Sequence, residues 1–441
     1  MSLYRKSQGC VIAALLALST GASSLAQAEV GFFSPQGVFE EFSDKVDFAM
    51  VNAYSIEQVE SSLIEAQRTH IKLFIDLGPQ FRHPAPIAEV GRIYIASDGT
   101  EKQKLFPARA DNKVWADSSE GIVLERIKPF LDLAKRYGDT IDTLFLIDEP
   151  YLNGVSKQAY ERLTSAVRSE LSMRGLDSVK IGVIFAGAMF NRDFAKQFEQ
   201  QAARYVEAID QEYSTIAGQS ATPAQQEWID IITTKRLTTY DLAGNMYTEG
   251  GVPDGVDVVS FDYYVSTLLL DSLHEHSLAW FASRFPKSSC ERFTGKPVSE
   301  VRHELSFFKD GPVLEGRKWI KHDRDMLNAI YQCRMNGALA LLRTELEKTE
   351  ADEEIMLIGE SSNNGLLEFD ARAVPEQGQP AKLVELRVRD EVIRAKQLLA
   401  EEHDIDRLMF FTYQDEYDHT IKLQIGGASG MASVLEAIYK D

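Results

Sequence analysis

The sequence predicts an α/β fold, a (β/α)8 barrel of the TIM type with long insertions after its third and sixth strands. Short runs rich in β-branched and aromatic residues alternate with longer helical patterns along the chain, as in consecutive βαβ units. Eight such runs are present, the number that a closed barrel needs. No GxGxxG motif follows the first run, although an open dinucleotide-binding sheet would normally carry one there.

The predicted strands are residues 30–33, 46–53, 71–77, 143–147, 180–185, 256–261, 355–358 and 408–411. Amphipathic patterns predict helices over residues 56–68, 120–137, 156–173 and 389–402. Aromatic pairs such as Phe410-Phe411 are expected to belong to the core.

Two connections are long, and each follows the C-terminal end of a strand. Residues 80–119 are expected to contain a hairpin, because runs 92–97 and 100–106 flank Asp98-Gly99, a favoured tight-turn pair. Residues 266–354 are expected to contain at least two helices. In a barrel this end carries the active site, so both insertions are expected to wall it.

The first 28 residues resemble a signal peptide. Arg5 and Lys6 precede an apolar run over residues 10–18, and Ala26-Gln27-Ala28 offers a small-residue cleavage site. That run is too short to cross a bilayer, and no later run is long enough, so no membrane insertion is expected. We therefore expect an exported protein, periplasmic or secreted, in which residues 29–441 form a single barrel domain.

The chain is acidic, with 67 Asp and Glu against 47 Lys and Arg. Such a surface disfavours nucleic acid and anionic membranes as partners. It serves solubility first, and it is compatible with a neutral or cationic substrate. Without the leader, Cys290 and Cys333 remain. They could form a disulfide in an oxidising compartment or stay as two buried thiols.

Two glutamates lie where buried strands are expected to end. Glu149 follows the apolar run 144–147, and Glu360 follows the run 355–359. A carboxylate there costs desolvation free energy unless it is paired, hydrogen-bonded or protonated. Because the fourth and seventh strands are not neighbours, the two groups should face each other across the mouth of the barrel. Hydrolysis of a glycosidic bond needs such a pair, one acid and one carboxylate.

The motifs around these residues resemble the clan A retaining glycoside hydrolases, in a divergent form. Residues 145–151 read FLIDEPY, 357–361 read LIGES, and 258–265 read VVSFDYYV. The resemblance implies a barrel in which Glu149 is the acid/base, Glu360 is the nucleophile and Tyr264 hydrogen-bonds the nucleophile. The chain departs from the family pattern at four positions, namely Asp148 for Asn, Asp262 and Gly78 for His, and Tyr413 for a substrate-stacking Trp. By this resemblance Asp262, Tyr264 and Tyr413 are expected to bind substrate.

Three further residues could bind substrate, and each has a simpler alternative. Asp148 could be a second active-site acid or pair with a nearby cation. Asp76 could line the mouth or hydrogen-bond a loop. Trp115 could stack on a sugar ring or pack under its own loop.

No cofactor or metal is expected. In His274-Glu275-His276 the histidines are two residues apart and would not share a helix face.

These observations favour a glycosidase with a carbohydrate substrate. A non-catalytic carbohydrate-binding or polysaccharide-assembly protein on the same barrel is the alternative. An esterase is disfavoured, because the chain has no GxSxG motif.

Overall fold

The computed structural model describes residues 28–81, 89–95, 101–107, 120–216, 246–263, 272–296, 324–349, 352–362, 380–418 and 423–440. The predicted signal peptide lies outside these residues except for Ala28, so it stays a prediction. The first strand begins at Glu29, the residue that follows the expected cleavage site.

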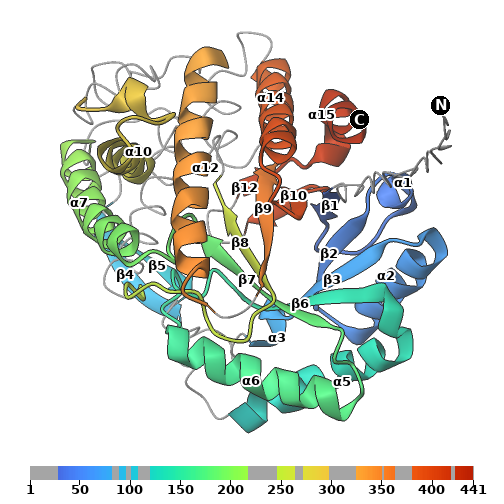
Figure 1. The fold of residues 1–441 in the computed structure, drawn as a ribbon. Helices are drawn as coiled ribbons and strands as arrows, with labels where there is room; N and C mark the ends of the chain where they lie inside the picture. Colours follow the sequence, from blue (N-terminus) through green and yellow to red (C-terminus); the bar gives the residue numbers. More distant parts are fainter. Residues whose placement is uncertain are drawn as a thin grey trace, which may run out of the picture.

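Eight parallel strands close into a barrel, which confirms the predicted fold (Figure 1). The strands are β1 (Glu29–Phe33), β2 (Phe48–Asn52), β3 (Lys72–Asp76), β6 (Ile141–Asp148), β7 (Lys180–Ala186), β8 (Val258–Asp262), β9 (Glu354–Glu360) and β10 (Arg407–Phe411). Their order around the barrel is β1, β10, β9, β8, β7, β6, β3, β2. Each predicted strand is present, with ends shifted by no more than two residues. The strand β1 closes the barrel by pairing with β10 and β2.

Helices surround the barrel (Figure 1). They are α1 (Glu40–Ser43), α2 (Ile56–Thr69), α3 (Gly78–Phe81), α5 (Glu120–Tyr137), α6 (Lys157–Met173), α7 (Arg192–Ile216), α10 (Ser272–Arg284), α12 (Arg324–Leu346), α14 (Pro380–Glu401) and α15 (Ala432–Tyr439), with short 3-10 turns η1 (Gly138–Thr140), η2 (Glu291–Phe293) and η3 (Ala428–Gly430). Ser55 and Ser156 cap α2 and α6 through their side chains, which is why these helices begin where they do. The predicted start of α14 was wrong by nine residues: it begins at Pro380, and a proline is tolerated in the first helical turn.

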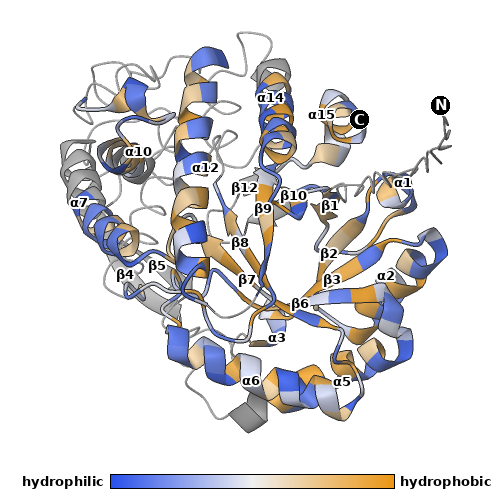
Figure 2. Ribbon diagram, in the orientation of Figure 1, coloured by the Kyte–Doolittle hydropathy of each residue, from blue (hydrophilic) through white to orange (hydrophobic). Residues whose placement is uncertain are grey.

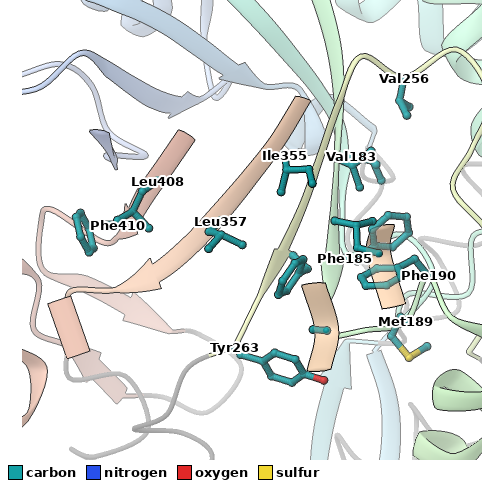
Figure 3. Packing of buried hydrophobic residues seen from close by; sticks show 14 of the residues in the cluster. Val183, Phe185, Met189, Phe190, Val256, Tyr263, Ile355, Leu357, Leu408 and Phe410 are labelled. Atoms are coloured by element: carbon teal, nitrogen blue, oxygen red, sulfur yellow. The ribbon is translucent and has the colours of Figure 1, made fainter. Parts of the chain in front are cut away.

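Successive side chains along each strand point to opposite faces of the sheet, and the core is therefore divided into two clusters. An inner cluster fills the barrel with side chains that include Phe48, Phe74 and Phe145. An outer cluster packs the other faces of the strands against the helices, and Figure 3 shows part of it around Phe185 and Leu357. Buried apolar side chains therefore lie on both faces of the sheet, as expected for a parallel sheet that helices cover, and the strands are coloured largely as hydrophobic in Figure 2.

The N-terminal end of the barrel is closed by an ionic network around Arg407. This side chain is 7% exposed, and its Nε donates to Glu29 at 2.8 Å. Its guanidinium nitrogens lie 3.1 Å from Asp142 and 2.7 Å from Glu354. Lys180 also pairs with Glu354. Desolvation opposes the charge of Arg407, but Asp142, Glu29 and Glu354 raise its pKa overall.

Both predicted insertions are present after β3 and β8. The first contains an antiparallel hairpin, β4 (Glu89–Ile95) and β5 (Glu101–Pro107), as expected, and its Asp98-Gly99 turn lies outside the described residues. The second contains α10, η2 and α12, so the expected pair of helices is confirmed.

A disulfide joins Cys290 to Cys333 and fixes η2 to α12, with a Cα–Cα distance of 4.5 Å. The alternative of two unpaired thiols is thereby excluded. No described helix combines the length and apolar character needed to cross a membrane.

Candidate active site

Carboxylates collect where the barrel strands end. Asp76, Asp148, Asp262 and Glu360 are the last residues of β3, β6, β8 and β9, and Glu149 follows Asp148. Because all eight strands are parallel, their C-terminal ends form one mouth. The fold therefore brings the two predicted catalytic glutamates and three of the predicted binding residues to the same end of the molecule.

Glu360 is the most deeply buried of the five, at 2% exposed. It continues the row of Met356 and Ile358, whose side chains belong to the inner cluster. The strand is fixed beyond this point, because Ser361 N donates to Phe411 O at 2.7 Å and Ser361 Oγ to Thr412 O at 3.3 Å. Its neighbours thus hold Glu360 in place on a rigid strand end.

Glu149 has an unusual backbone conformation. Its φ is +45°, and His70 is the other non-glycine residue in the described chain with positive φ. His70 is the C-cap of α2, a place where a left-handed residue is common, whereas Glu149 caps no helix. The turn after it is held by Asn153, whose Nδ2 donates to the carbonyls of Asp148 and Glu149, both at 3.1 Å.

Tyr151, the last residue of the DEPY segment, is structural. Tyr151 is fully buried, and its hydroxyl donates to Gly251 O at 2.7 Å. Its ring packs edge-on against Phe185 and Tyr247. A left-handed residue costs roughly 1–2 kcal/mol, and such residues persist where surrounding contacts impose them, often at functional sites. The anchored Tyr151 and the Asn153 turn supply such contacts around Glu149.

Asp76 and Asp262 both accept hydrogen bonds from nearby backbone groups. Asp76 Oδ1 accepts from Gly78 N at 2.8 Å, and a Cβ at Gly78 would come within 2.9 Å of the same oxygen. Asp262 Oδ1 accepts from Gly187 N at 3.3 Å. Of the two alternatives for Asp76, the structure therefore contains the hydrogen bond to a loop. Asp148 is exposed at the end of β6.

Tyr413 does not fit its expected role in stacking on a substrate. It is 6% exposed, and its ring packs against Phe32, Phe39 and Phe42 between the barrel and α1. The departure arises because Tyr413 lies beyond the end of β10 and turns into the outer core. Tyr264 and Trp115 lie outside the described residues.

Two aromatic residues at the mouth were missed by the sequence reasoning. Phe33 and Phe411 end β1 and β10, are partly exposed, and stack with ring centroids 5.3 Å apart. Phe411 is in register with Glu360 and with Phe33. The pair Phe410-Phe411 was expected to be core, and this holds for Phe410 alone. Strand alternation could have shown the difference, because Phe411 shares a face with Met409 of the inner cluster.

The mouth therefore combines carboxylates with the apolar rings of Phe33 and Phe411, which lie beside Glu360. Among the residues that the structure describes, no three His, Cys, Asp or Glu side chains are grouped so as to hold a metal ion. The arrangement suits a ligand with polar groups and apolar faces, because two adjacent strands end in aromatic residues and four others end in carboxylates.

No family model and no curated protein matches the sequence. Among solved structures, the chain is similar to an endo-laminarinase from Formosa Hel1_33_131, with a TM-score of 0.40, 9% identity and coverage of 88% of this chain and 78% of that one. A beta-glucosidase from Exiguobacterium marinum has a TM-score of 0.36 and 11% identity, covering 90% and 86%. The virulence factor SghA from Agrobacterium tumefaciens has a TM-score of 0.33 and 8% identity, covering 90% and 84%.

Proposed function

We propose that this protein is an exported glycoside hydrolase that acts by the retaining, two-step mechanism. The observation that carries the proposal is the pair of glutamates at the mouth of one closed barrel. Glu360 is a buried carboxylate at the end of β9, and Glu149 is held in a left-handed conformation after β6. The C-terminal ends of the strands are where barrel enzymes carry their catalytic residues, and left-handed residues cluster at functional sites.

In the first step, a carboxylate oxygen of Glu360 attacks the anomeric carbon of the sugar. The bond from that carbon to the glycosidic oxygen breaks, and protonated Glu149 gives its proton to the departing oxygen. In the second step, Glu149 takes a proton from a water molecule, whose oxygen displaces Glu360 from the anomeric carbon. The sugar leaves with its original configuration, and both carboxyl groups return to their starting states.

The substrate that fits this mouth is a neutral oligosaccharide or polysaccharide. The net charge of −20 and the carboxylates at the strand ends disfavour an anionic sugar. The stacked rings of Phe33 and Phe411 beside Glu360 offer an apolar surface for the C–H face of a sugar ring.

Export is supported by the disulfide, since such bonds persist in oxidising compartments. The leader would be removed after Ala28, leaving Glu29 as the first residue of β1. N-terminal sequencing of the exported protein tests this part, and retention of Met1 would contradict it.

Replacement of Glu149 by alanine tests the mechanism. On an aryl glycoside with a good leaving group, Glu149→Ala should complete the first step and then accumulate the glycosyl-enzyme. Added azide should restore turnover and release a glycosyl azide, because azide needs no general base. A wild-type rate on substrates with poor leaving groups would show that Glu149 is not the acid.

The distance between the carboxyl groups of Glu149 and Glu360 provides a second test. A crystal structure should show about 5–5.5 Å, whereas roughly 6.5–9.5 Å would indicate inversion. If the protein binds sugars and cleaves none, it is the non-catalytic carbohydrate-binding protein instead.

A further inference from the structure

The loop between β2 and α2 presents an aromatic ring at the mouth of the barrel. Tyr54 lies two residues after Asn52, the last residue of β2, and is 46% exposed. Among the described residues, the other large apolar side chains that are exposed are Ile64 and Met173. These two lie on α2 and α6, in the outer layer of helices. Tyr54 differs from them because it stands at the end of the molecule that carries Glu149 and Glu360.

Several hydrogen bonds hold Tyr54 in position. Asn52 Nδ2 donates to the Tyr54 hydroxyl at 2.9 Å. The backbone nitrogen of Tyr54 donates to Asn52 O at 3.0 Å and lies 3.3 Å from Gln58 Oε1, a second acceptor. Gln58 in turn donates from Nε2 to Pro35 O at 3.1 Å, which ties the loop to the segment after β1. An exposed ring that is fixed before binding loses little conformational entropy when a ligand packs against it.

The register of the strands relates Tyr54 to Glu360. Asn52 continues the inward row of Phe48 and Met50 and is aligned with Asp76 on β3. On the other side, Glu360 is aligned with Phe411, Phe411 with Phe33, and Phe33 with Met50. From Glu360 to β2, successive strands therefore place Phe411, Phe33 and then Tyr54 along one arc of the mouth.

We propose that Tyr54 is a platform for a sugar unit next to the one whose bond is cleaved. The position of the cleaved bond rests on the proposed function, whereas the platform itself needs only that a sugar chain binds here. A pyranose ring has a face of C–H groups and a rim of hydroxyls, and tyrosine offers an apolar ring with a polar tip. The substrate class is thus a neutral chain of at least two sugar units that extends from Glu360 towards β2.

Affinity electrophoresis tests the platform without requiring cleavage. The full-length mature protein is run in native gels that contain laminarin, hydroxyethylcellulose, xylan or mannan. At least one of these polysaccharides should retard the wild type, and Tyr54→Ala should bind it roughly two- to tenfold more weakly. Tyr54→Phe keeps the ring and should retain most of the retardation. Ile64→Ala is the matched control, because it removes an exposed apolar side chain away from the mouth.

Cleavage of the same polysaccharides, followed as released reducing ends, separates the two proposals. If the wild type cleaves one of them and Tyr54→Ala is retarded as strongly as wild type, the platform is wrong and the glycosidase stands. If retardation depends on Tyr54 while nothing is cleaved, the platform stands and the glycosidase is wrong. Absence of retardation of the wild type in every gel also overturns the platform.

Discussion

The two ends of the barrel carry different arrangements of charge. At the N-terminal end, acidic and basic residues pair with one another, with Arg407 in contact with Glu29, Asp142 and Glu354. At the C-terminal end, four of the eight strands finish in a carboxylate and none of these eight described strands finishes in a basic residue. Strand β9 contains both environments, since it begins at Glu354 and ends at Glu360.

We infer from this difference that the N-terminal end serves stability, whereas the C-terminal end holds the proposed active site. Where charges neutralise one another across neighbouring strands, the network closes the barrel and covers the inner cluster, with the Arg407 guanidinium 5.0 Å from the centre of the Phe74 ring. At the C-terminal end, Glu360 is buried where a barrel carries its active site, and removing this carboxylate from water costs desolvation free energy. The same architecture thus separates the two functions by about the length of one strand.

Neutralising the glutamate at each end of β9 should separate these roles most strongly. Glu360→Gln should lower kcat by roughly a thousandfold or more, because the nucleophile is lost, and should leave the free energy of unfolding nearly unchanged. Glu354→Gln should keep the activity and lower the free energy of unfolding by roughly 1–2 kcal/mol, because Arg407 and Lys180 lose a charged partner. Steady-state kinetics and urea titration measure the two effects.

The reverse result would break the comparison between the ends. If Glu354→Gln abolishes turnover without loss of stability, or Glu360→Gln unfolds the barrel while the remaining folded fraction stays active, the ends have been assigned the wrong way round.

Removal of the central arginine should have the next largest effect. Arg407→Ala leaves three carboxylates without their shared cation, and a loss of roughly 3 kcal/mol is expected. These acids are partly exposed, which keeps the loss below the upper range for fully buried pairs. The matched control is Arg343→Ala, where an arginine that is 36% exposed pairs with Glu402 and Asp404, both at 2.6 Å. There the loss should stay within about 1 kcal/mol, so equal losses in urea titration would contradict the comparison.

A third group of buried charges, between α12 and α14, should make stability depend on pH. Burial raises the pKa of Glu391 to about 7, against the opposing effect of Arg394, whose Nη1 lies 2.7 Å away, and of Arg387. Because the folded pKa exceeds the unfolded one, the contribution of Glu391 is full below about pH 4.5. It is lost as the pH rises through 7.

Glu391→Gln should therefore gain stability relative to wild type as the pH rises over this window, by up to roughly a few kcal/mol. Thermal unfolding at a series of pH values measures the gain. Glu401→Gln, at the exposed end of the same helix, is the control. A difference between variant and wild type that does not change with pH would contradict the shift.

The fold could be predicted from the sequence because its signals are local. Each buried parallel strand is an apolar run, and the eight runs lie within two residues of the observed strands. The start of α14 at Pro380 was missed, because a proline near a helical pattern can mark a boundary of the helix as well as its first turn. The pairing of Cys290 with Cys333 was an open alternative, because sequence spacing does not determine whether two cysteines meet in space.

The positions of the residues in the candidate site could be predicted only in part. Glu149, Glu360 and the aspartates at strand ends follow from the abrupt change from apolar to acidic residues. Which aromatic residues face the mouth depends on strand alternation and on where each strand stops. Phe411 therefore lies beside Glu360, while Tyr413, two residues later, turns into the outer core. The hydrogen bond from Asn52 to Tyr54 joins residues only two apart, but it depends on the course of the loop after β2, which no pattern in the sequence predicts.

The smallest expected effect concerns the backbone of Glu149, and it tests whether this residue at the mouth is held in a strained conformation. At most positions glycine is less stable than alanine by roughly 0.5–1 kcal/mol, because it loses more backbone entropy on folding. At Glu149 the φ of +45° reverses this preference, since alanine keeps a Cβ that the left-handed region disfavours. Glu149→Gly should therefore unfold at higher urea than Glu149→Ala, by about 1 kcal/mol, and both variants should lack the acid. The adjacent pair Asp148→Gly and Asp148→Ala is the control, because Asp148 lies in β6, where the ordinary order should hold. If glycine is less stable than alanine at both positions, the left-handed conformation stores no strain, and the conformational argument for Glu149 as a functional residue fails.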